Sequence, residues 1–166
     1  MEATRQLSTK IDYLCTMIYK LNLPEYQLQL RIENQQKQVF DPLRGCWVAL
    51  TPEEWVRQQM FHHLTETLGY PATRMSHEHS INYNNLKKRC DGVVYSQDGQ
   101  PQVIMEYKAP TVNIIQKVFD QIAIYNLQLN VPYLLISNGM QHFFCRIDFE
   151  SRRYVFAREI LPYAEL

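Results

Sequence analysis

Polar and apolar positions alternate at different periods along this chain, and each period predicts a different element. Residues 26–33, YQLQLRIE, alternate strictly enough to predict a strand. Residues 38–50 read as a returning strand that is broken at Asp41-Pro42. Residues 7–21 carry a weaker amphipathic pattern that suits a short helix. The N-terminal part of the chain is therefore expected to contribute a strand pair.

The segment that follows, TPEEWVRQQMFHHLTETLGY, predicts a helix with well-marked ends. Thr51 suits the N-cap and Pro52 the first helical position. Glu53 and Glu54 fall in the first turn, where the helix dipole favours negative charge. Gly69 supplies the residue type that commonly ends a helix.

The rest of the chain combines strands with one more helix. Two β-branched runs flank Asp98-Gly99, which predicts a hairpin with a two-residue turn. The apolar residues that come next recur at helical spacing, with Thr111 as a possible cap. Two further strands follow, joined by a turn at Asn138-Gly139, and then a last strand. This order predicts an α/β fold on one mixed sheet.

The hairpin brings acidic residues together. With a two-residue turn, Val94 faces Val103, an apolar pair that supports the register, and Asp91 faces Glu106. Facing side chains have Cβ atoms about 4.5–5.5 Å apart, so the two carboxylates repel unless a divalent cation lies between them. Lys108 shares the face of Glu106. There it would stabilise developing negative charge or orient an attacking water.

This arrangement resembles that of the PD-(D/E)xK nuclease superfamily, with Asp91, Glu106 and Lys108 as the motif residues. Cys90 stands before the aspartate where the family motif has proline. Gln121 and Tyr125 lie four residues apart in the second predicted helix, which is similar to the QxxxY element of RecB-type nucleases.

The resemblance can be narrowed by the order of several short segments. The N-terminal nuclease domain of type I restriction enzyme R subunits shows the same order, and a small stand-alone form of it is the nearest likeness; the segments are FDPLRGCWVALTPEEWVRQ, RCDGVVY, EYKAP, DQIAIYN and ISNG. The likeness covers roughly residues 21–144. It implies a restriction-endonuclease-like core, with a mixed central β-sheet flanked by α-helices. It also implies cleavage of DNA phosphodiester bonds that depends on Mg²⁺ or Mn²⁺.

The resemblance also implies roles for individual residues. It assigns the metal to Asp91 and Glu106, the attacking water to Lys108, support of the site to Gln121 and Tyr125, and an additional metal-side acid to Glu54. Glu54 is equally explained as part of a helix start. Two histidines on one face of a possible strand, His77 and His79, could bind zinc, but a solvated segment is the preferred interpretation.

Charge and motifs limit what the chain does alone. It has 17 basic and 17 acidic residues, a formal net charge of zero, which counts against tight independent binding of nucleic acid. The candidate DNA contacts are Arg57, Lys87, Lys88 and Arg89, although the arginines could instead pair with nearby acids. No GxxxxGK[ST] phosphate loop occurs, so an ATP-driven motor or a specificity subunit is expected to be a separate partner.

Two other functions remain open. A catalytically silent module on the same fold would recruit DNA or a partner subunit, and a metabolic enzyme has weaker support because no nucleophile motif occurs. Scattered cysteines without a CxxC pair, no signal peptide and no membrane-spanning run predict a cytoplasmic protein. Residues 1–20 are expected to form an extension to a domain at 21–166, and Met17 is an alternative start to Met1.

Overall fold

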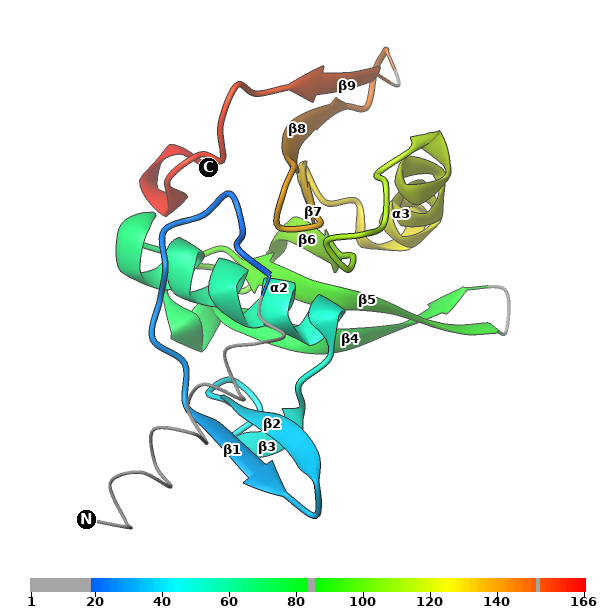
Figure 1. The fold of residues 1–166 in the computed structure, drawn as a ribbon. Helices are drawn as coiled ribbons and strands as arrows, with labels where there is room; N and C mark the ends of the chain where they lie inside the picture. The colour runs from blue at the N-terminus through cyan, green and yellow to red at the C-terminus, as the bar shows by residue number, and fades with distance from the viewer. Residues whose placement is uncertain (1–18, 84–85, 152) are drawn as a thin grey trace, which may run out of the picture.

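The computed structural model describes residues 19–83, 86–151 and 153–166, which form two β-sheets and two longer helices (Figure 1). The elements in chain order are β1 (Leu30–Glu33), β2 (Gln36–Asp41), β3 (Cys46–Ala49), α2 (Pro52–His62), a π-helical turn (His63–Thr67), a 3₁₀ turn (Ala72–Arg74), β4 (Met75–Tyr83), β5 (Leu86–Tyr95), β6 (Pro101–Tyr107), α3 (Gln116–Leu129), β7 (Tyr133–Ser137), β8 (His142–Asp148), β9 (Arg153–Phe156) and a 3₁₀ turn (Tyr163–Glu165). Among the described residues, no helix is long and apolar enough to span a membrane.

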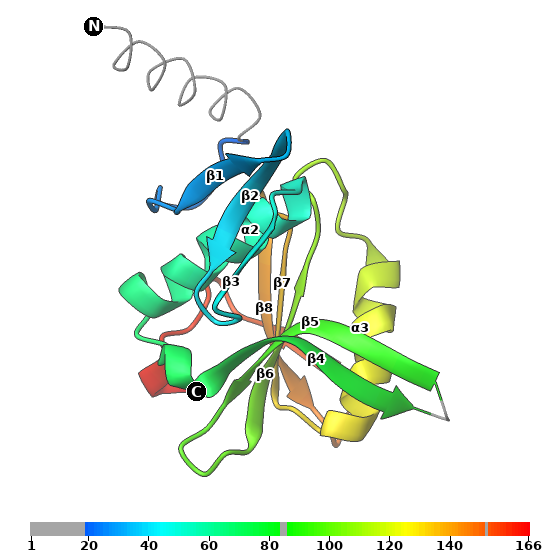
Figure 2. The same ribbon diagram turned by 90° about the horizontal axis from the view of Figure 1, so that it is seen from below.

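The larger sheet is mixed, with strand order β4-β5-β6-β7-β8-β9 and one parallel pair, β6 with β7. Helices α2 and α3 lie on its two faces (Figure 2). Val94, Val103 and Met105 pack with the α2 side, whereas Val93 and Ile104 pack with the α3 side. The alternation follows from the two-residue period of a strand, so the sheet is buried on both faces. The expected α/β fold with a mixed central sheet flanked by helices is confirmed.

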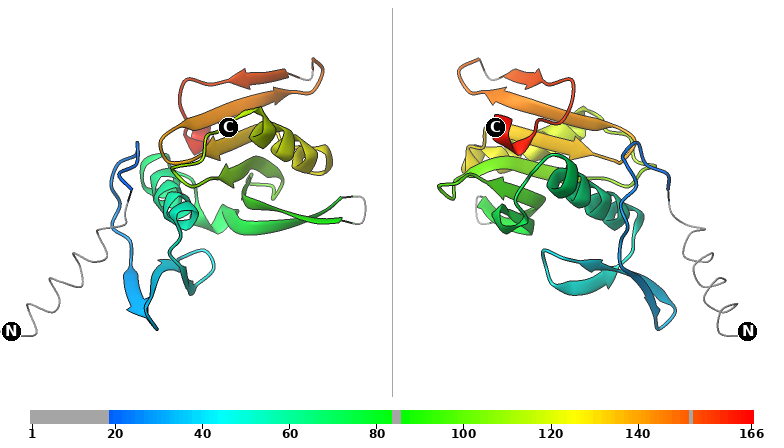
Figure 3. Two further views of the ribbon diagram at one scale, coloured as in Figure 1. Left: turned by 45° about the vertical axis from the view of Figure 1, so that its right-hand side comes forward. Right: turned by 90° about the vertical axis from the view of Figure 1, so that its left-hand side faces the viewer.

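The smaller sheet, β1-β2-β3, is antiparallel and lies below α2 in both views of Figure 3. Its strands β2 and β3 are joined by a turn after Asp41, as expected. Strands β4 and β5 form a long antiparallel ribbon that projects beyond the rest of the larger sheet (Figures 1 and 3). Only the C-terminal part of β5, from Gly92 onward, also pairs with β6. The strand expected at residues 26–33 is shorter and begins at Leu30.

The predicted start of α2 is confirmed, whereas α2 ends at His62 and the π-helical turn continues from there toward Gly69. The Thr51 side chain accepts a hydrogen bond from the Glu54 backbone N–H at 3.1 Å, and Pro52 opens the helix. Gly69 has a φ of +71° just after the π-helical turn. The helix expected at residues 7–21, the extension expected at residues 1–20 and the start at Met17 fall wholly or mostly on residues 1–18, which lie outside the described residues.

The two-residue turn expected at Asp98-Gly99 is wrong in detail. Ser96 and Gln100 close the loop, because the Ser96 N–H donates to the Gln100 carbonyl and the Gly99 N–H to the Ser96 carbonyl. Three residues therefore make the turn, with glycine at the positive φ that such a turn requires. A register shift between Val94 and Tyr95 compensates for the extra residue. The facing pairs from Val94 with Val103 to Gly92 with Met105 are those expected.

The expected start of the second helix is also wrong. Helix α3 begins at Gln116, and no side chain caps it, so Thr111 is not its cap. The residues in between form a loop with a turn in which the Val112 N–H donates to the Ala109 carbonyl at 2.9 Å. The Asn138 side chain also binds the Val112 carbonyl. One hydrogen bond within the turn and one from a distant strand end therefore stabilise this segment as a loop.

Candidate functional site

Two carboxylates meet where the β5–β6 pairing stops. The ladder runs through Val94 with Val103 and ends at Gly92 with Met105, so Asp91 and Glu106 are the next residues on their strands. In place of a further rung, the Tyr107 backbone N–H donates to Asp91 Oδ2 at 2.7 Å. The neighbouring strand β4 is also irregular here, with Glu78 at a φ of +56°. Asp91 thus lies in an interruption of the sheet.

Glu106 is the more deeply buried acid, with 3% of its surface exposed. Its Oε1 accepts from Lys108 Nζ at 2.6 Å and from Gln121 Nε2 of α3 at 3.0 Å. Its Oε2 is buried and has no hydrogen-bond partner among the described residues. Burial and the charge of Asp91 raise the pKa of Glu106 to about 7, against the opposing effect of Lys108. The site therefore holds a carboxylate that is costly to ionise without a further cation.

Lys108 is positioned by the strand that continues from Glu106. Its backbone N–H donates to the Ser137 carbonyl of β7 at 2.9 Å. Burial lowers the pKa of Lys108, but Glu106 and Asp91 raise it more, and the net direction is upward. The amine is therefore an ammonium at neutral pH and acts as a cation and hydrogen-bond donor, not as a base.

Glu54 does not face the two carboxylates as an available ligand. Its oxygens accept from Arg44 at 2.9 Å, Arg57 at 2.6 Å and Gln58 at 2.8 Å. The neighbouring Glu53 is 44% exposed on its side chain, and Asp91 and Lys108 both act on its charge. Burial and then Asp91 raise the pKa of Glu53. The sequence indicates Glu54 as the additional acid, but Glu53 is the acid whose pKa is affected by Asp91 and Lys108.

A second buried acid, Asp41, lies at the end of β2. Asp41 binds Arg44 Nε and lies 2.9 Å from His77 Nδ1, and the side chains of Asp41 and His77 are fully buried. Burial alone would raise the pKa of Asp41, but His77 and Arg44 hold it well below its usual range. The expectation of a solvated segment is wrong at His77. The side chain of His79 lies outside the described residues.

The candidate DNA contacts are placed differently from one another. Arg57 is buried and binds Asp91 Oδ1 at 3.0 Å as well as Glu54, which favours the alternative of pairing with acids. Arg89 is 62% exposed on β5, 3.4 Å from Glu78 Oε2. The backbones of Lys87, Lys88 and Tyr125 lie in β5 and α3, but their side chains fall outside the described residues.

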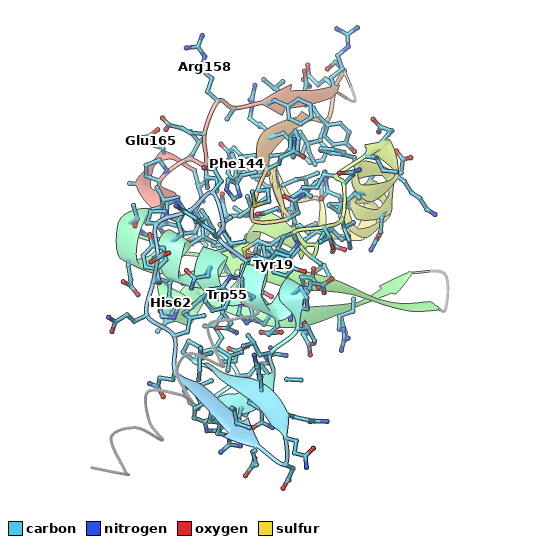
Figure 4. The ribbon with its side chains drawn as sticks, in the orientation of Figure 1. Tyr19, Trp55, His62, Phe144, Arg158 and Glu165 are labelled. Carbon is cyan, nitrogen blue, oxygen red and sulfur yellow. The ribbon has the colours of Figure 1, made fainter. Side chains whose placement is uncertain are left out.

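A cavity of about 280 Å³ lies on another flank of α2, lined by Tyr19, Tyr26, Trp55 and Gln59 among others. Figure 4 shows Tyr19 and Trp55 close together, and the Trp55 Nε1–H donates to the Tyr19 carbonyl at 3.0 Å. Neither Asp91 nor Glu106 lines this cavity. It is therefore separate from the carboxylate site.

The residues of the carboxylate site fit a hard divalent cation. Within the described parts of the chain, no three His, Cys, Asp or Glu side chains are arranged to hold a metal. Mg²⁺, however, commonly takes only one or two protein carboxylates and keeps water and substrate phosphate oxygens as its other ligands. Asp91 and Glu106 supply two, and Glu106 Oε2 is a buried oxygen for which residues 19–83, 86–151 and 153–166, as described, offer no hydrogen-bond partner. Such an oxygen is what a cation would satisfy.

The family of the chain follows from its sequence. Residues 52–161, more than half of the chain, match the family described as type I restriction enzyme R protein N terminus. The chain belongs to this family. The match contains α2, the β5–β6 hairpin, α3 and the strands up to β9, so the carboxylate site lies within the matched R-protein region.

A solved structure shows the same fold as this R-protein domain. It is a fragment of a protein assigned as the HsdR subunit of a type I restriction enzyme from Vibrio vulnificus YJ016, with a TM-score of 0.53 and 16% sequence identity. The likeness covers 70% of this chain and 24% of that chain, so this chain spans about a quarter of its length. The expected restriction-endonuclease-like fold is thereby confirmed. No curated protein matches the sequence.

The ISNG segment of this R-protein domain, residues 136–139, is hydrogen-bonded to the loop that follows Lys108. Asn138 is buried, its Nδ2 donates to the Val112 carbonyl at 2.9 Å, and its Oδ1 accepts from the Met140 and Gln141 N–H groups. The bond to Val112 joins the end of β7 to the loop between β6 and α3, and the other two close the turn between β7 and β8. Glu106 and Gln121 lie on either side of that loop, so its shape affects how they meet.

Replacing Asn138 by alanine is expected to lower the free energy of unfolding by about 2–3 kcal/mol, because the buried Asn138 side chain makes three hydrogen bonds that alanine cannot make. Urea denaturation measures this change. Asn113→Ala, an exposed asparagine in the same loop, is the matched control and should stay within about 0.5 kcal/mol of the wild type. Equal stability of the two variants would show that the Asn138 bonds do not hold the loop.

Proposed function

We propose that this chain is a metal-dependent DNA endonuclease domain of a type I-like restriction or defence system. The observation that carries the proposal is that the charge of Asp91 acts on the buried Glu106, whose Oε2 has no hydrogen-bond partner among the described residues and whose Oε1 binds the Lys108 ammonium. A structure selected for stability alone would avoid two neighbouring carboxylates, one of them with a raised pKa. Membership of the R-protein family supports DNA as the substrate. The motor that moves DNA would belong to a separate partner.

In the proposed mechanism Asp91 and Glu106 hold Mg²⁺ or Mn²⁺, which when bound supplies Lewis-acid polarisation of the phosphate and a water of lowered pKa. The Tyr107 N–H and Arg57 fix the Asp91 carboxylate, and Gln121 fixes Glu106. Lys108 donates from its ammonium toward negative charge that develops on the phosphate oxygens. Glu53, which is partly exposed beside the site, adds negative charge that favours a cation.

The projecting β4–β5 ribbon is the proposed route of contact with the DNA backbone. Arg89 is exposed on β5 two residues before Asp91, and Lys87 and Lys88 precede it. Cationic side chains near a phosphodiester backbone give affinity that is independent of base sequence and weakens with salt. A formal net charge of zero limits this contribution, so a partner subunit is expected to supply much of the affinity.

The purified chain is expected to cut plasmid or linear single-stranded DNA in the presence of Mg²⁺ or Mn²⁺, and EDTA should stop the reaction. Agarose gels follow the nicking and linearisation of the plasmid. A metal-dependent rise in melting temperature with no cleavage of any substrate would instead favour the binding module. Absence of both effects would contradict the proposed site.

A further inference from the structure

Arg57 occupies an unusual place for a surface-helix arginine. Its side chain is 6% exposed, and three acids surround the guanidinium. Nη1 lies 2.6 Å from Glu54 Oε2, and Nη2 lies 3.0 Å from Asp91 Oδ1 and 3.7 Å from Glu53 Oε1. Its Nε is buried without a hydrogen-bond partner among the described residues. The arginine is thus held by charge at the edge of the carboxylate site.

Both carboxylate oxygens of Asp91 accept hydrogen bonds from other residues of this chain. Arg57 takes Oδ1, and the Tyr107 N–H takes Oδ2 at 2.7 Å. A guanidinium stays charged at any pH at which the protein is folded, so this engagement cannot be relieved by deprotonation. Glu106, by contrast, has no donor to its Oε2 in the part of the chain that the structure describes. The two proposed metal ligands are therefore unequally available.

We propose that Arg57 is the resident counter-ion of Asp91 and that a divalent cation must compete with it for this carboxylate. The inference rests on the proposed metal site. A cation at Asp91 meets the positive charge of a guanidinium that lies in a largely buried setting, where charges are poorly screened. Arg57 therefore sets the metal affinity of the isolated chain, in addition to orienting Asp91. The residue that sequence reasoning offered as a DNA contact acts instead on metal occupancy.

The test measures Mn²⁺ affinity of the full chain by calorimetry, without DNA and without an activity readout. Arg57→Met is combined with Glu54→Gln, so that a buried cation and a buried anion leave together and Asp91 keeps its Tyr107 partner. The double variant is expected to bind Mn²⁺ at least tenfold more tightly than the wild type. Glu54→Gln alone is the control. In this variant Arg57 still pairs with Asp91, so it should bind Mn²⁺ no more tightly than the wild type does.

Arg57→Lys is the second variant, for use if the double variant does not fold. A lysine retains the charge but lacks the fork that spans Glu54 and Asp91, so a several-fold gain in affinity is expected. Equal or weaker Mn²⁺ binding by the variants, with a wild type that binds measurably, would overturn the role of Arg57 and leave the proposed function intact. If neither the wild type nor any variant binds Mn²⁺, the proposed metal site itself fails.

Discussion

Replacing Lys108 by alanine is expected to lower metal-dependent DNA cleavage by about 10²–10³-fold, the loss that follows removal of one well-placed donor to developing charge. The Lys108 ammonium lies 2.6 Å from Glu106 Oε1 and is only partly exposed. In the alanine variant, water would therefore compensate poorly for the lost positive charge. Its pKa is raised by Glu106 and Asp91 in spite of burial, which keeps it protonated during turnover. The rate of plasmid nicking at saturating Mg²⁺ measures the effect.

Lys117→Ala provides the matched control, because Lys117 is an exposed lysine on α3. This variant should cut at the wild-type rate. The Lys108→Ala protein should keep its fold by circular dichroism and should still gain melting temperature with Mn²⁺, because Asp91 and Glu106 remain. Asp91→Asn, in contrast, should lose both cleavage and the metal effect. Cleavage by Lys108→Ala at the wild-type rate would remove Lys108 from the mechanism.

Features decided by local chemistry could be predicted from the sequence. The Thr51 cap and Pro52 define the start of α2 because they act within one turn of helix. The pairing of Val94 with Val103 was predicted because both strands are buried and a one-residue slip would invert their faces. The turn was predicted with one residue too few. The register survived because the shift after Val94 offsets the longer turn.

Features decided by the placement of α2 against the sheet could not be predicted. Neighbouring helix positions point about 100° apart, so sequence alone cannot say whether Glu53 or Glu54 faces Asp91. Glu54 turns toward Arg44 of the β2–β3 turn, and Arg57 reaches Asp91, which is 34 positions away in the chain. Such contacts leave no period or motif in the sequence.

The meeting of Glu106 with Gln121 lies between these cases. The QxxxY spacing places Gln121 on the same helix face as Tyr125. Ile104 and Glu106, two residues apart in β6, point to the face of the sheet that α3 covers. Motif resemblance therefore indicated the pair, although the helix begins later than predicted. The buried pair of Asp41 and His77 had no such motif and appeared only in the structure.

Without metal, the Glu106→Gln variant is expected to gain stability relative to the wild type as the pH rises. The pKa of Glu106 is raised from its usual value to about 7 in the folded state. The unfolded chain therefore ionises first, and the wild type loses stability from about pH 4.5 upward until the folded carboxyl has also ionised. A glutamine does not titrate. The difference in unfolding free energy, variant minus wild type, should grow by roughly 2 kcal/mol between pH 5 and pH 8.

Urea denaturation at pH 5, 6, 7 and 8 in EDTA measures this difference, and a comparison between the two pH limits removes the constant cost of the substitution itself. Glu159→Gln, an exposed acid near the C-terminus, is the control and should show no such trend. At pH 8, Mn²⁺ should then restore stability to the wild type and not to Glu106→Gln, because the cation satisfies the ionised carboxylate and its buried Oε2. A pH-independent difference would mean that Glu106 ionises normally, and the cation would then have no unfavourable charge to relieve at this position.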